Sequence, residues 1–257
     1  MQAPGSETQG DGVRSVLRAL DLLMLFDDTH RSRSVRELID ATGLAKSTVV
    51  RLVATLEQRG LLWTRGDGRI TPGPGLLRWA RLAHAAWQLP PEALACLEQL
   101  SADSGGESAR IYVRQGTSRV CIAQHEGTQQ LRHVVRVGEE MPLWAGASGH
   151  VLLTGVSPQQ VDRTAVASGL GAEFETVLAE RVRTAAAQGW AVSHGERAAG
   201  VSAVAAPITD TDGQVVGALG LGGPTTRFTE ERVAAFVAPL TEAAKRLSEL
   251  RFIGGGS

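Results

Sequence analysis

The stretch from Ser34 to Arg59, SVRELIDATGLAKSTVVRLVATLEQR, constrains the fold of this chain more than any other. Ser34 can accept a hydrogen bond at the start of a helix, and Glu37 stands three residues later, where it completes a capping box. Gly43 follows where a helix ends in the left-handed conformation that glycine adopts without strain. These positions predict a first short helix that ends at a glycine turn.

A second helix is predicted from about Ala45 to Arg59. Its apolar residues recur at intervals of three and four, which places them on one buried stripe: Val49, Leu52, Val53 and Leu56. The opposite face carries Ser47, Arg51, Thr55 and Gln58, with Lys46 and Thr48 beside it. Two short helices joined by a glycine turn, the second amphipathic and basic near its start, are typical of a helix-turn-helix.

The segments on either side extend this motif to a winged helix-turn-helix over residues 13–72. Residues 13–26 have the apolar spacing of a helix that packs under the other two. Two short strand candidates, at 61–64 and 69–71, flank the turn sequence RGDG at 65–68. This arrangement predicts a β-hairpin wing.

Basic residues are concentrated in this region. The whole chain has a net charge of −1, but residues 30–69 carry eight Lys or Arg against four Asp or Glu. This surplus indicates a DNA-contacting module, although an ordinary solvated helix face or a polar hairpin tip is the alternative. Ser34 is first of all a helix cap, and its position also allows a DNA contact. The complete set of predicted DNA-binding residues is Ser34, Lys46, Ser47, Thr48, Arg51, Arg65 and Arg69.

The rest of the chain predicts a second domain between short tails. Residues 1–12 and 252–257 have the composition of disordered tails, and residues 73–88 form a linker helix after a Pro-Gly break. Residues 89–251 alternate strand and helix patterns, with turns such as Asp212-Gly213. Strands are predicted at 107–115, 119–125, 132–137, 190–193, 201–208 and 214–222. Hairpin-connected strands flanked by helices give an α+β domain with an antiparallel sheet.

Missing residue patterns disfavour several other classes of function. Cys96 and Cys121 form neither a metal-binding spacing nor a disulfide framework, and the histidines are scattered, so no metal or other cofactor is expected. The absence of a secretory signal and of an apolar run of about 18 residues predicts a cytoplasmic protein without a membrane partner. A hydrolase using Ser148 is the enzymatic alternative, but GASGH is not the Gly-x-Ser-x-Gly elbow and no base pairs with it.

The last strand indicates a ligand site. Ala218, Gly220 and Gly222 share one face and leave it almost without side chains, which makes room for a ligand or for a closely packed helix. The segment 146–149, Gly-Ala-Ser-Gly, begins a short helix whose free N–H groups can hold a carboxylate. We therefore expect Gly146, Ala147 and Ser148 to form the facing wall of the site.

Two longer blocks of sequence resemble the IclR family of bacterial transcriptional regulators. TGLAKSTVVRLVATLEQRGLL (42–62) resembles the family's helix-turn-helix signature, and GERAAGVSAVAAPITDTDGQVVGALGLGGP (195–224) resembles its C-terminal signature. RVCIAQHEG (119–127) and PLWAGASGHVLL (142–153) also fit, so the similarity spans roughly residues 13–250.

The resemblance implies a winged helix-turn-helix, a linker helix and a GAF-like C-terminal domain that binds a small organic effector, often a carboxylic or aromatic acid. It also implies a homodimer or homotetramer on a palindromic operator in double-stranded DNA. A repressor is the default, and an activator that requires its ligand is the alternative. A winged helix that has lost DNA binding is a further alternative, against which Arg51 and the wing arginines argue.

The family's carboxylate-binding members use the backbone of the 146–149 loop and four further positions on the last strands. By position these four are Ser193, Ala203, Gly220 and Gly222 here. The family pattern has a thiol or a small residue at the position of Ala203, and it has serines at the positions of Gly220 and Gly222. The glycines depart from that pattern, which predicts a roomier and more apolar pocket. Ile122, Trp144 and Val204 are expected to line it, with plain core packing as the alternative for each.

Overall fold

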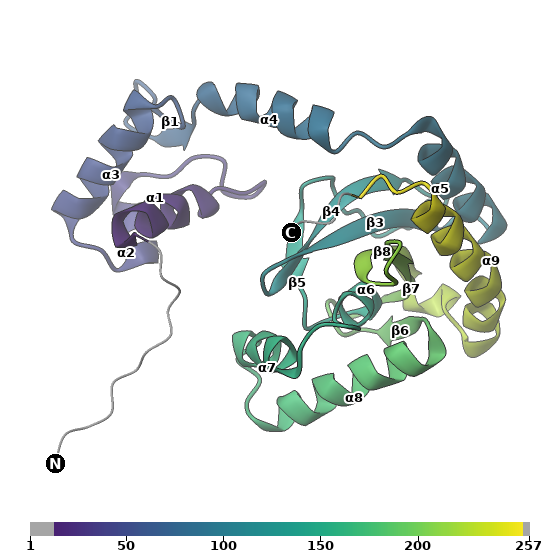
Figure 1. Cartoon of the computed structure of the whole chain (residues 1–257). Coiled ribbons are helices and arrows are strands. Elements are labelled where there is room, and N and C mark those ends of the chain that lie inside the picture. The colour runs from purple at the N-terminus through teal and green to yellow at the C-terminus, as the bar shows by residue number, and fades with distance from the viewer. Residues whose placement is uncertain (1–12, 254–257) are drawn as a thin grey trace, which may run out of the picture. The chain divides into compact units, whose positions relative to one another are not determined.

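A computed structural model describes residues 13–253 of the chain. These residues divide into two compact units, and the boundary in the sequence lies between Gln88 and Leu89. Figure 1 shows the helices and strands of both units. Each unit has a hydrophobic core of its own, so each can be described by itself.

The first unit combines a three-helix motif with a two-stranded wing and a following helix. Its elements are α1 (Arg14–Met24), α2 (Val35–Thr42), α3 (Lys46–Gln58), β1 (Leu62–Thr64), β2 (Ile70–Pro72) and α4 (Gly75–Ala86). The predicted capping box forms at α2: Ser34 Oγ accepts from the Glu37 N–H at 3.2 Å, and the Glu37 carboxylate accepts from the Ser34 N–H at 2.5 Å. Gly43 ends α2 with a φ of 65°. The predicted stripe of α3 is buried in the core of this unit.

The wing is tied to its surroundings through both strands. β1 and β2 pair antiparallel. Ile70 of β2 also exchanges two backbone hydrogen bonds with Arg33, of 2.7 and 2.9 Å. Thr64 of β1 donates its N–H to the Glu57 carboxylate of α3 at 2.7 Å. The wing is therefore fixed to the helix-turn-helix by hydrogen bonds from both of its strands.

The second unit is built on a six-stranded antiparallel sheet in the order β5-β4-β3-β8-β7-β6. The strands are β3 (Ser108–Gln115), β4 (Ser118–His125), β5 (Glu140–Pro142), β6 (Ala191–His194), β7 (Val201–Thr209) and β8 (Val215–Pro224). The helices are α5 (Pro91–Asp103), α6 (Ala147–Leu152), α7 (Pro158–Ala167), α8 (Glu173–Gln188), the short 3-10 helix η1 (Thr225–Arg227) and α9 (Glu230–Glu249). This architecture confirms the predicted α+β class with an antiparallel sheet.

Each face of the sheet is covered by its own set of helices (Figure 1), and a separate hydrophobic cluster lies under each set. α5 and α9 cover one face, where Leu219 and Leu221 of β8 enter the core. α6, α7 and α8 cover the other face, where Ala218 of β8 is buried. β8 therefore presents leucines to one layer and its small residues to the other, as its alternation predicts.

The strand predicted at 132–137 does not form. Gly138, with a φ of 87°, donates its N–H to the Cys121 carbonyl of β4 and brings the chain into register with the sheet only from that point. The edge strand β5 consequently begins later, at Glu140. The residues before it leave the sheet, and the His133 carbonyl accepts a hydrogen bond from Arg110 instead.

The alternation in β3 predicted a half-buried strand, whereas both of its faces are buried. Arg110 is 3 % exposed and Tyr112 is 7 % exposed. Both lie on the face that α6 and the segment before β5 cover. Charged and phenolic side chains on a covered face need hydrogen-bond partners there, so the space beneath α6 is expected to be polar.

Candidate functional site

The start of α3 forms a basic surface that faces solvent. Lys46, Ser47 and Arg51 are exposed, and within residues 13–253 their side chains make no hydrogen bond or ion pair. Thr48 beside them is half-buried. Ala45 provides no side-chain cap to α3, which leaves the first N–H groups of the helix for another acceptor. Such a helix start, flanked by cations and hydroxyls, can contact phosphates and base edges.

The other three residues predicted to contact DNA differ in how free they are. Arg65 is exposed and its side chain has no partner over the described range. Arg69 is clamped: its Nε donates to Ser32 Oγ at 2.8 Å, its Nη2 donates to Ser32 O at 2.7 Å, and Nη2 lies 3.5 Å from the Glu37 carboxylate. Ser34 is occupied as the cap of α2, and its N–H and hydroxyl lower the pKa of Glu37. Arg69 and Ser34 thus join the wing to α2, while Arg65 stays available to an external anion.

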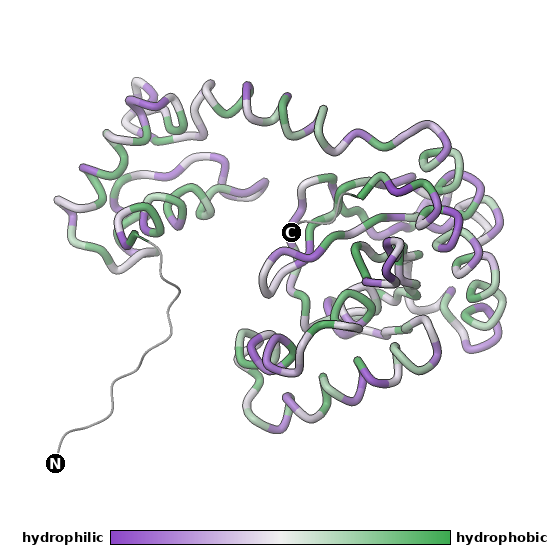
Figure 2. The backbone as a smooth tube through the Cα atoms, in the orientation of Figure 1, coloured by the Kyte–Doolittle hydropathy of each residue, from purple (hydrophilic) through white to green (hydrophobic). Residues whose placement is uncertain are grey.

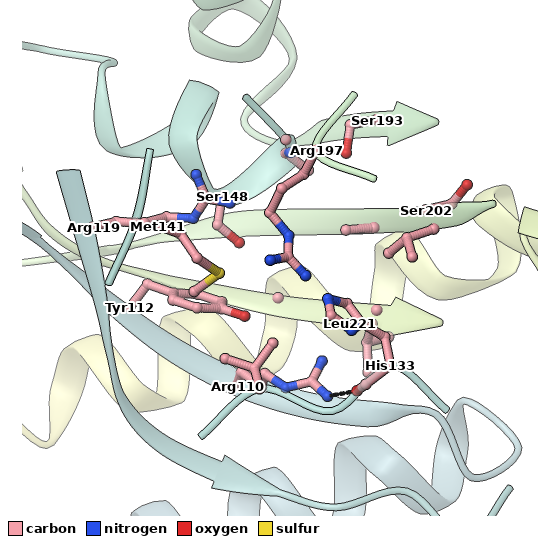
Figure 3. A pocket seen from close by; sticks show the side chains of 17 residues that line it. Arg110, Tyr112, Arg119, His133, Met141, Ser148, Ser193, Arg197, Ser202 and Leu221 are labelled. Carbon is pink, nitrogen blue, oxygen red and sulfur yellow. Dashed lines mark hydrogen bonds between the residues drawn. The ribbon is translucent and has the colours of Figure 1, made fainter. Parts of the chain in front are cut away.

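A cavity of about 50 Å³ lies in the second unit between β3, β7, β8, the start of α6 and the segment before β5 (Figure 3). Seven of the nine predicted effector residues line it: Gly146, Ala147, Ser148, Ser193, Ala203, Gly220 and Gly222. The lining also includes polar residues outside the predicted set: Arg110, Tyr112, Arg119, His133, Arg197 and Ser202. The cavity is therefore small and cationic, which corrects the expectation of a roomy apolar pocket.

Arg110 of β3 explains why Gly222 has no side chain. A Cβ on Gly222 would lie 3.3 Å from Arg110 Nη1, so the guanidinium occupies the space above this glycine. Its Nη2 donates to the His133 carbonyl, and its Nε is buried without any hydrogen-bond partner among the residues described. Arg110 thus reaches the cavity with part of its donor capacity unused.

Gly220 makes room for a helix. A Cβ there would lie 2.8 Å from Ser148 Oγ of α6, closer than real Cβ contacts allow. The bare face of β8 therefore makes room for groups of the chain itself, one of them the closely packed helix that was the stated alternative to a ligand. One glycine admits the start of α6, and the other admits a charged side chain of the cavity.

Arg119 of β4 holds the wall of the cavity. It is 4 % exposed, and its Nη1 donates to the carbonyls of Pro142 and Ala145. Its guanidinium carbon lies 5.6 Å from the centroid of the Tyr112 ring, a cation–π geometry. Burial lowers the pKa of Arg119 to about 10, so this arginine is still charged near neutral pH. It fixes the loop that leads into α6.

His133 faces the cavity as a neutral imidazole. Burial, followed by the charges of Arg197 and Arg110, lowers its pKa to about 4. Its Nε2 is buried without a hydrogen-bond partner within residues 13–253. The ring is therefore an unused hydrogen-bonding group beside two guanidinium groups.

Two of the N–H groups at the start of α6 are already taken. Gly146 donates to the Glu196 carboxylate at 2.9 Å, and Ala147 donates to Ser193 Oγ at 2.9 Å. Glu196 also lies 3.1 Å from His150 Nε2 and 3.3 Å from Arg181 Nη1. Burial by itself raises the pKa of Glu196, but His150, the Gly146 N–H and Arg181 outweigh it, so the net pKa is lowered. The chain's own Glu196 carboxylate thus takes one of the N–H groups that were predicted to hold the carboxylate of an effector.

Ile122 and Trp144 lie outside the cavity, and so does Val204. β4 bulges opposite Ile111 and Tyr112, which turns Ile122 to the same side as Ala123, toward α5 and α9. Val204 belongs to that same core. Trp144 instead packs edge-on against Phe174 of α8, with ring centroids 5.9 Å apart. Plain core packing, the stated alternative, describes all three.

The sequence did contain a signal for the residues that were missed. Arg110 and Arg119 interrupt strands whose other residues are mostly apolar. A basic side chain in such a strand either lies on an exposed face of the sheet or is buried in a site that supplies its hydrogen-bond partners. Only the position of α6 distinguishes these two cases, and that position depends on long-range packing.

Within residues 13–253, no helix is both long and apolar enough to cross a membrane. Over the same range, no group of three or more His, Cys, Asp or Glu side chains could hold a metal ion.

Comparisons with known proteins match both units. The family described as IclR helix-turn-helix domain matches residues 15–66, and the one described as Bacterial transcriptional regulator IclR C-terminal matches residues 86–249. Curated relatives include the HTH-type transcriptional regulator KipR of Bacillus subtilis, 27 % identical over 91 % of this chain and 96 % of the relative. The transcriptional repressor IclR of Escherichia coli is 27 % identical over 92 % of this chain and 89 % of the relative.

A solved structure gives the same picture. An IclR-family protein from Rhodococcus sp., described as a transcriptional regulator, is 45 % identical, with a TM-score of 0.63 over 97 % of this chain and 98 % of that one. The similarity therefore extends over both units of the chain.

Proposed function

Because the chain belongs to the IclR family of bacterial transcriptional regulators, we propose that it is a repressor whose DNA affinity is set by a small organic anion. Its relatives are regulators and not enzymes, so Ser148 is given no nucleophilic role. The observation that carries the proposal is an unpartnered basic helix start on the same chain as a cavity lined by three guanidinium groups. In this proposal residues 13–72 bind DNA, 73–88 link and 89–251 sense the effector.

The DNA contacts follow from which side chains are free. Lys46, Ser47, Thr48 and Arg51 lie at the start of α3, the part of a recognition helix that reaches base edges in the major groove. Arg65 is placed to contact the backbone from the wing. Arg69 and Ser34 act indirectly, because they hold the wing and α2 in one arrangement. Since its partner is chromosomal DNA, the protein works in the cytoplasm.

Homodimerisation is supported by apolar surface on the first unit. α1 exposes a row of large hydrophobic residues: Val13, Val16, Leu17, Leu20 and Met24. α4 has no buried residue at all and exposes Leu77, Trp79, Leu82 and Trp87. Hydrophobic residues recur along both helices in Figure 2. Contiguous exposed apolar residues mark protein interfaces. A second copy of the chain would place a second α3 on the other half of a palindromic operator.

The effector is proposed to be a carboxylate because the cavity offers cations and hydrogen-bond donors. Arg110, Arg119 and Arg197 line it together with Tyr112 and His133. Arginine binds carboxylates with two parallel hydrogen bonds, which gives geometric selectivity as well as affinity. Binding in the second unit then favours one arrangement of the dimer over another, and DNA affinity follows this population shift.

The decisive experiment measures binding of the full chain to the promoter beside its own gene, at two salt concentrations. Arg51→Ala is expected to weaken binding by about 1–3 kcal/mol and to reduce the salt dependence. Arg183→Ala serves as the control, because this substitution removes the same charge from an exposed arginine of α8 in the second unit. Sedimentation of the free protein and of the complex distinguishes dimer from tetramer.

Three outcomes are informative. Salt-dependent, sequence-selective binding that Arg51→Ala weakens and Arg183→Ala leaves intact supports the proposal, and release of DNA by a carboxylate identifies a repressor. DNA binding that requires the carboxylate favours the ligand-requiring alternative of the same family over a repressor that its effector releases. Failure of genome-wide selection to find any bound sequence, with and without carboxylates, would overturn DNA binding as the function.

A further inference from the structure

The cavity of the second unit has an unbalanced charge. Three guanidinium groups and one imidazole line it, and none of its lining residues is Asp or Glu. The acidic side chains nearby have other partners. Glu107 forms a two-pronged ion pair with Arg227, and Glu196 is held by Gly146, His150 and Arg181.

Arg110 is a buried cation with unused hydrogen-bond donors. It is 3 % exposed, one carbonyl accepts from its Nη2, and its Nε is buried without a partner. Over residues 13–253 no carboxylate lies within ion-pair distance of it. A buried cation without a counter-charge is strongly unfavourable, and a bound anion removes that penalty.

Arg197 approaches the same space from the loop after β6. Its side chain is 23 % exposed, and the nearest carboxylate, that of Glu139, is 3.9 Å from Nη1. That distance is at the limit of an ion pair and leaves the fork of the guanidinium free for a closer acceptor. Figure 3 shows the guanidinium groups of Arg197 and Arg110 entering the cavity from opposite sides.

Arg119 differs from these two arginines. Its Nε is also buried without a partner among the residues described, but its Nη1 donates to two backbone carbonyls and its guanidinium packs on the Tyr112 ring. It therefore adds positive potential to the site while acting mainly as a support of the wall. Two guanidinium groups, those of Arg110 and Arg197, are left to hold a ligand directly.

The geometry points to a compact dianion as the effector, with Arg110 and Arg197 each holding one negatively charged end. Tyr112 and Ser148 line the space between them and supply hydroxyl groups (Figure 3). This inference deepens the proposed function and rests on it, because it assigns the chemical class of the effector to the same site.

The size of the cavity narrows the class. At about 50 Å³ it accommodates few non-hydrogen atoms. A short dicarboxylate fits this limit, and so does a phosphate group, which carries nearly two charges near neutral pH. A monocarboxylate of the right size leaves one of the two guanidinium groups without a counter-charge.

The inference is tested with pairs of ligands that have the same shape and differ by one charge. Oxalate is compared with oxamate, and malonate with malonamate, by calorimetry on the full chain near neutral pH. Inorganic phosphate is titrated in parallel to separate a phosphate source from a carboxylate source. The dianion of each pair is expected to bind at least about tenfold more tightly than its monoanionic partner, as one additional charge-assisted interaction provides.

Variants locate the effect. Arg197→Gln is expected to weaken dianion binding about tenfold and to abolish the preference over the monoanion. Arg114→Gln is the matched control, because Arg114 lies on β3 four residues beyond Arg110 and does not line the cavity. Circular dichroism and the melting temperature of each variant show that the fold is retained.

Equal affinities within both pairs, no binding by any dianion, or a loss of affinity that Arg114→Gln shares would overturn the dianion assignment. The proposed function fails separately, through the Arg51→Ala experiment on DNA. DNA binding that responds to a monoanion or a neutral molecule leaves the regulator standing and removes only the dianion.

Discussion

Replacing His133 by glutamine should make the second unit less sensitive to acid. In the folded protein the pKa of His133 lies at about 4, because the ring is buried and faces Arg197 and Arg110, whereas an unperturbed histidine titrates near 6.5. Between these two values the unfolded chain binds a proton that the folded chain refuses. Stability therefore falls as the pH drops from 6.5 toward 4, and the loss is complete below the folded pKa.

The two pKa values also set the magnitude. Integrating proton binding from about pH 7 to about pH 5 gives a loss of about 2 kcal/mol for a fully shielded ring. His133 is partly exposed, so solvent screening reduces the expected loss to about 1–2 kcal/mol. A compact dianion in the cavity should raise the pKa of His133, because it offsets the two guanidinium charges that lower it.

The assay combines urea unfolding with NMR titration of the histidine ring protons. Wild type and His133→Gln are unfolded at both pH values, and the difference between the two proteins removes the contribution of every other titrating group. The NMR signal missing from the variant identifies His133 and gives its pKa with and without oxalate. The reasoning is refuted if both proteins lose the same stability between the two pH values, or if the assigned ring titrates near 6.5 in the folded protein.

Three further predictions concern the glycine face, the helix cap and the internal carboxylate. Gly222→Ser should displace the Arg110 guanidinium, whose Nη1 lies 3.3 Å from the new Cβ, and should weaken anion binding about tenfold in calorimetry; unchanged affinity would show that Arg110 does not contact the ligand. Ser34→Ala should cost about 1 kcal/mol of stability in urea unfolding, because the cap of α2 is lost. Glu196→Gln should cost about 1–3 kcal/mol near pH 7, since the partly buried carboxylate charge facing Arg181 and His150 disappears. Because the pKa of Glu196 is lowered, its contribution is present above about pH 4.5 and vanishes as the pH falls, so variant and wild type should converge in strong acid.

Local sequence rules predicted the first unit closely because its determinants are local. The capping box, the glycine stop and the stripe of α3 involve residues within one or two helical turns of each other. Arg69 is the exception. Its contacts with Ser32 and Glu37 join residues more than thirty positions apart, and no short-range pattern reveals them.

The cavity was predicted only in part because its walls come from distant segments. Gly220 and Gly222 of β8 and residues 146–148 were predicted from their composition, and they do line it. Arg110 and Tyr112 could not be placed, since alternation along β3 does not say whether a helix covers its polar side. His133 was not identified because residues 132–137 have the pattern of a strand. Ile122 was placed in the cavity wrongly because a bulge in β4 reverses the side of the sheet that it faces.

The contact between Arg110 and Gly222 means that the residues at these two positions cannot be chosen independently. Arg110 is paired in register with Gly220, so Gly222 lies diagonally across from it on β8, and a Cβ at Gly222 would lie 3.3 Å from Arg110 Nη1. Any side chain at position 222 therefore shifts the guanidinium by a few tenths of an ångström. The place of the charge in the cavity thus depends on a residue of the neighbouring strand, and the stability effects of substitutions at the two positions should not be additive.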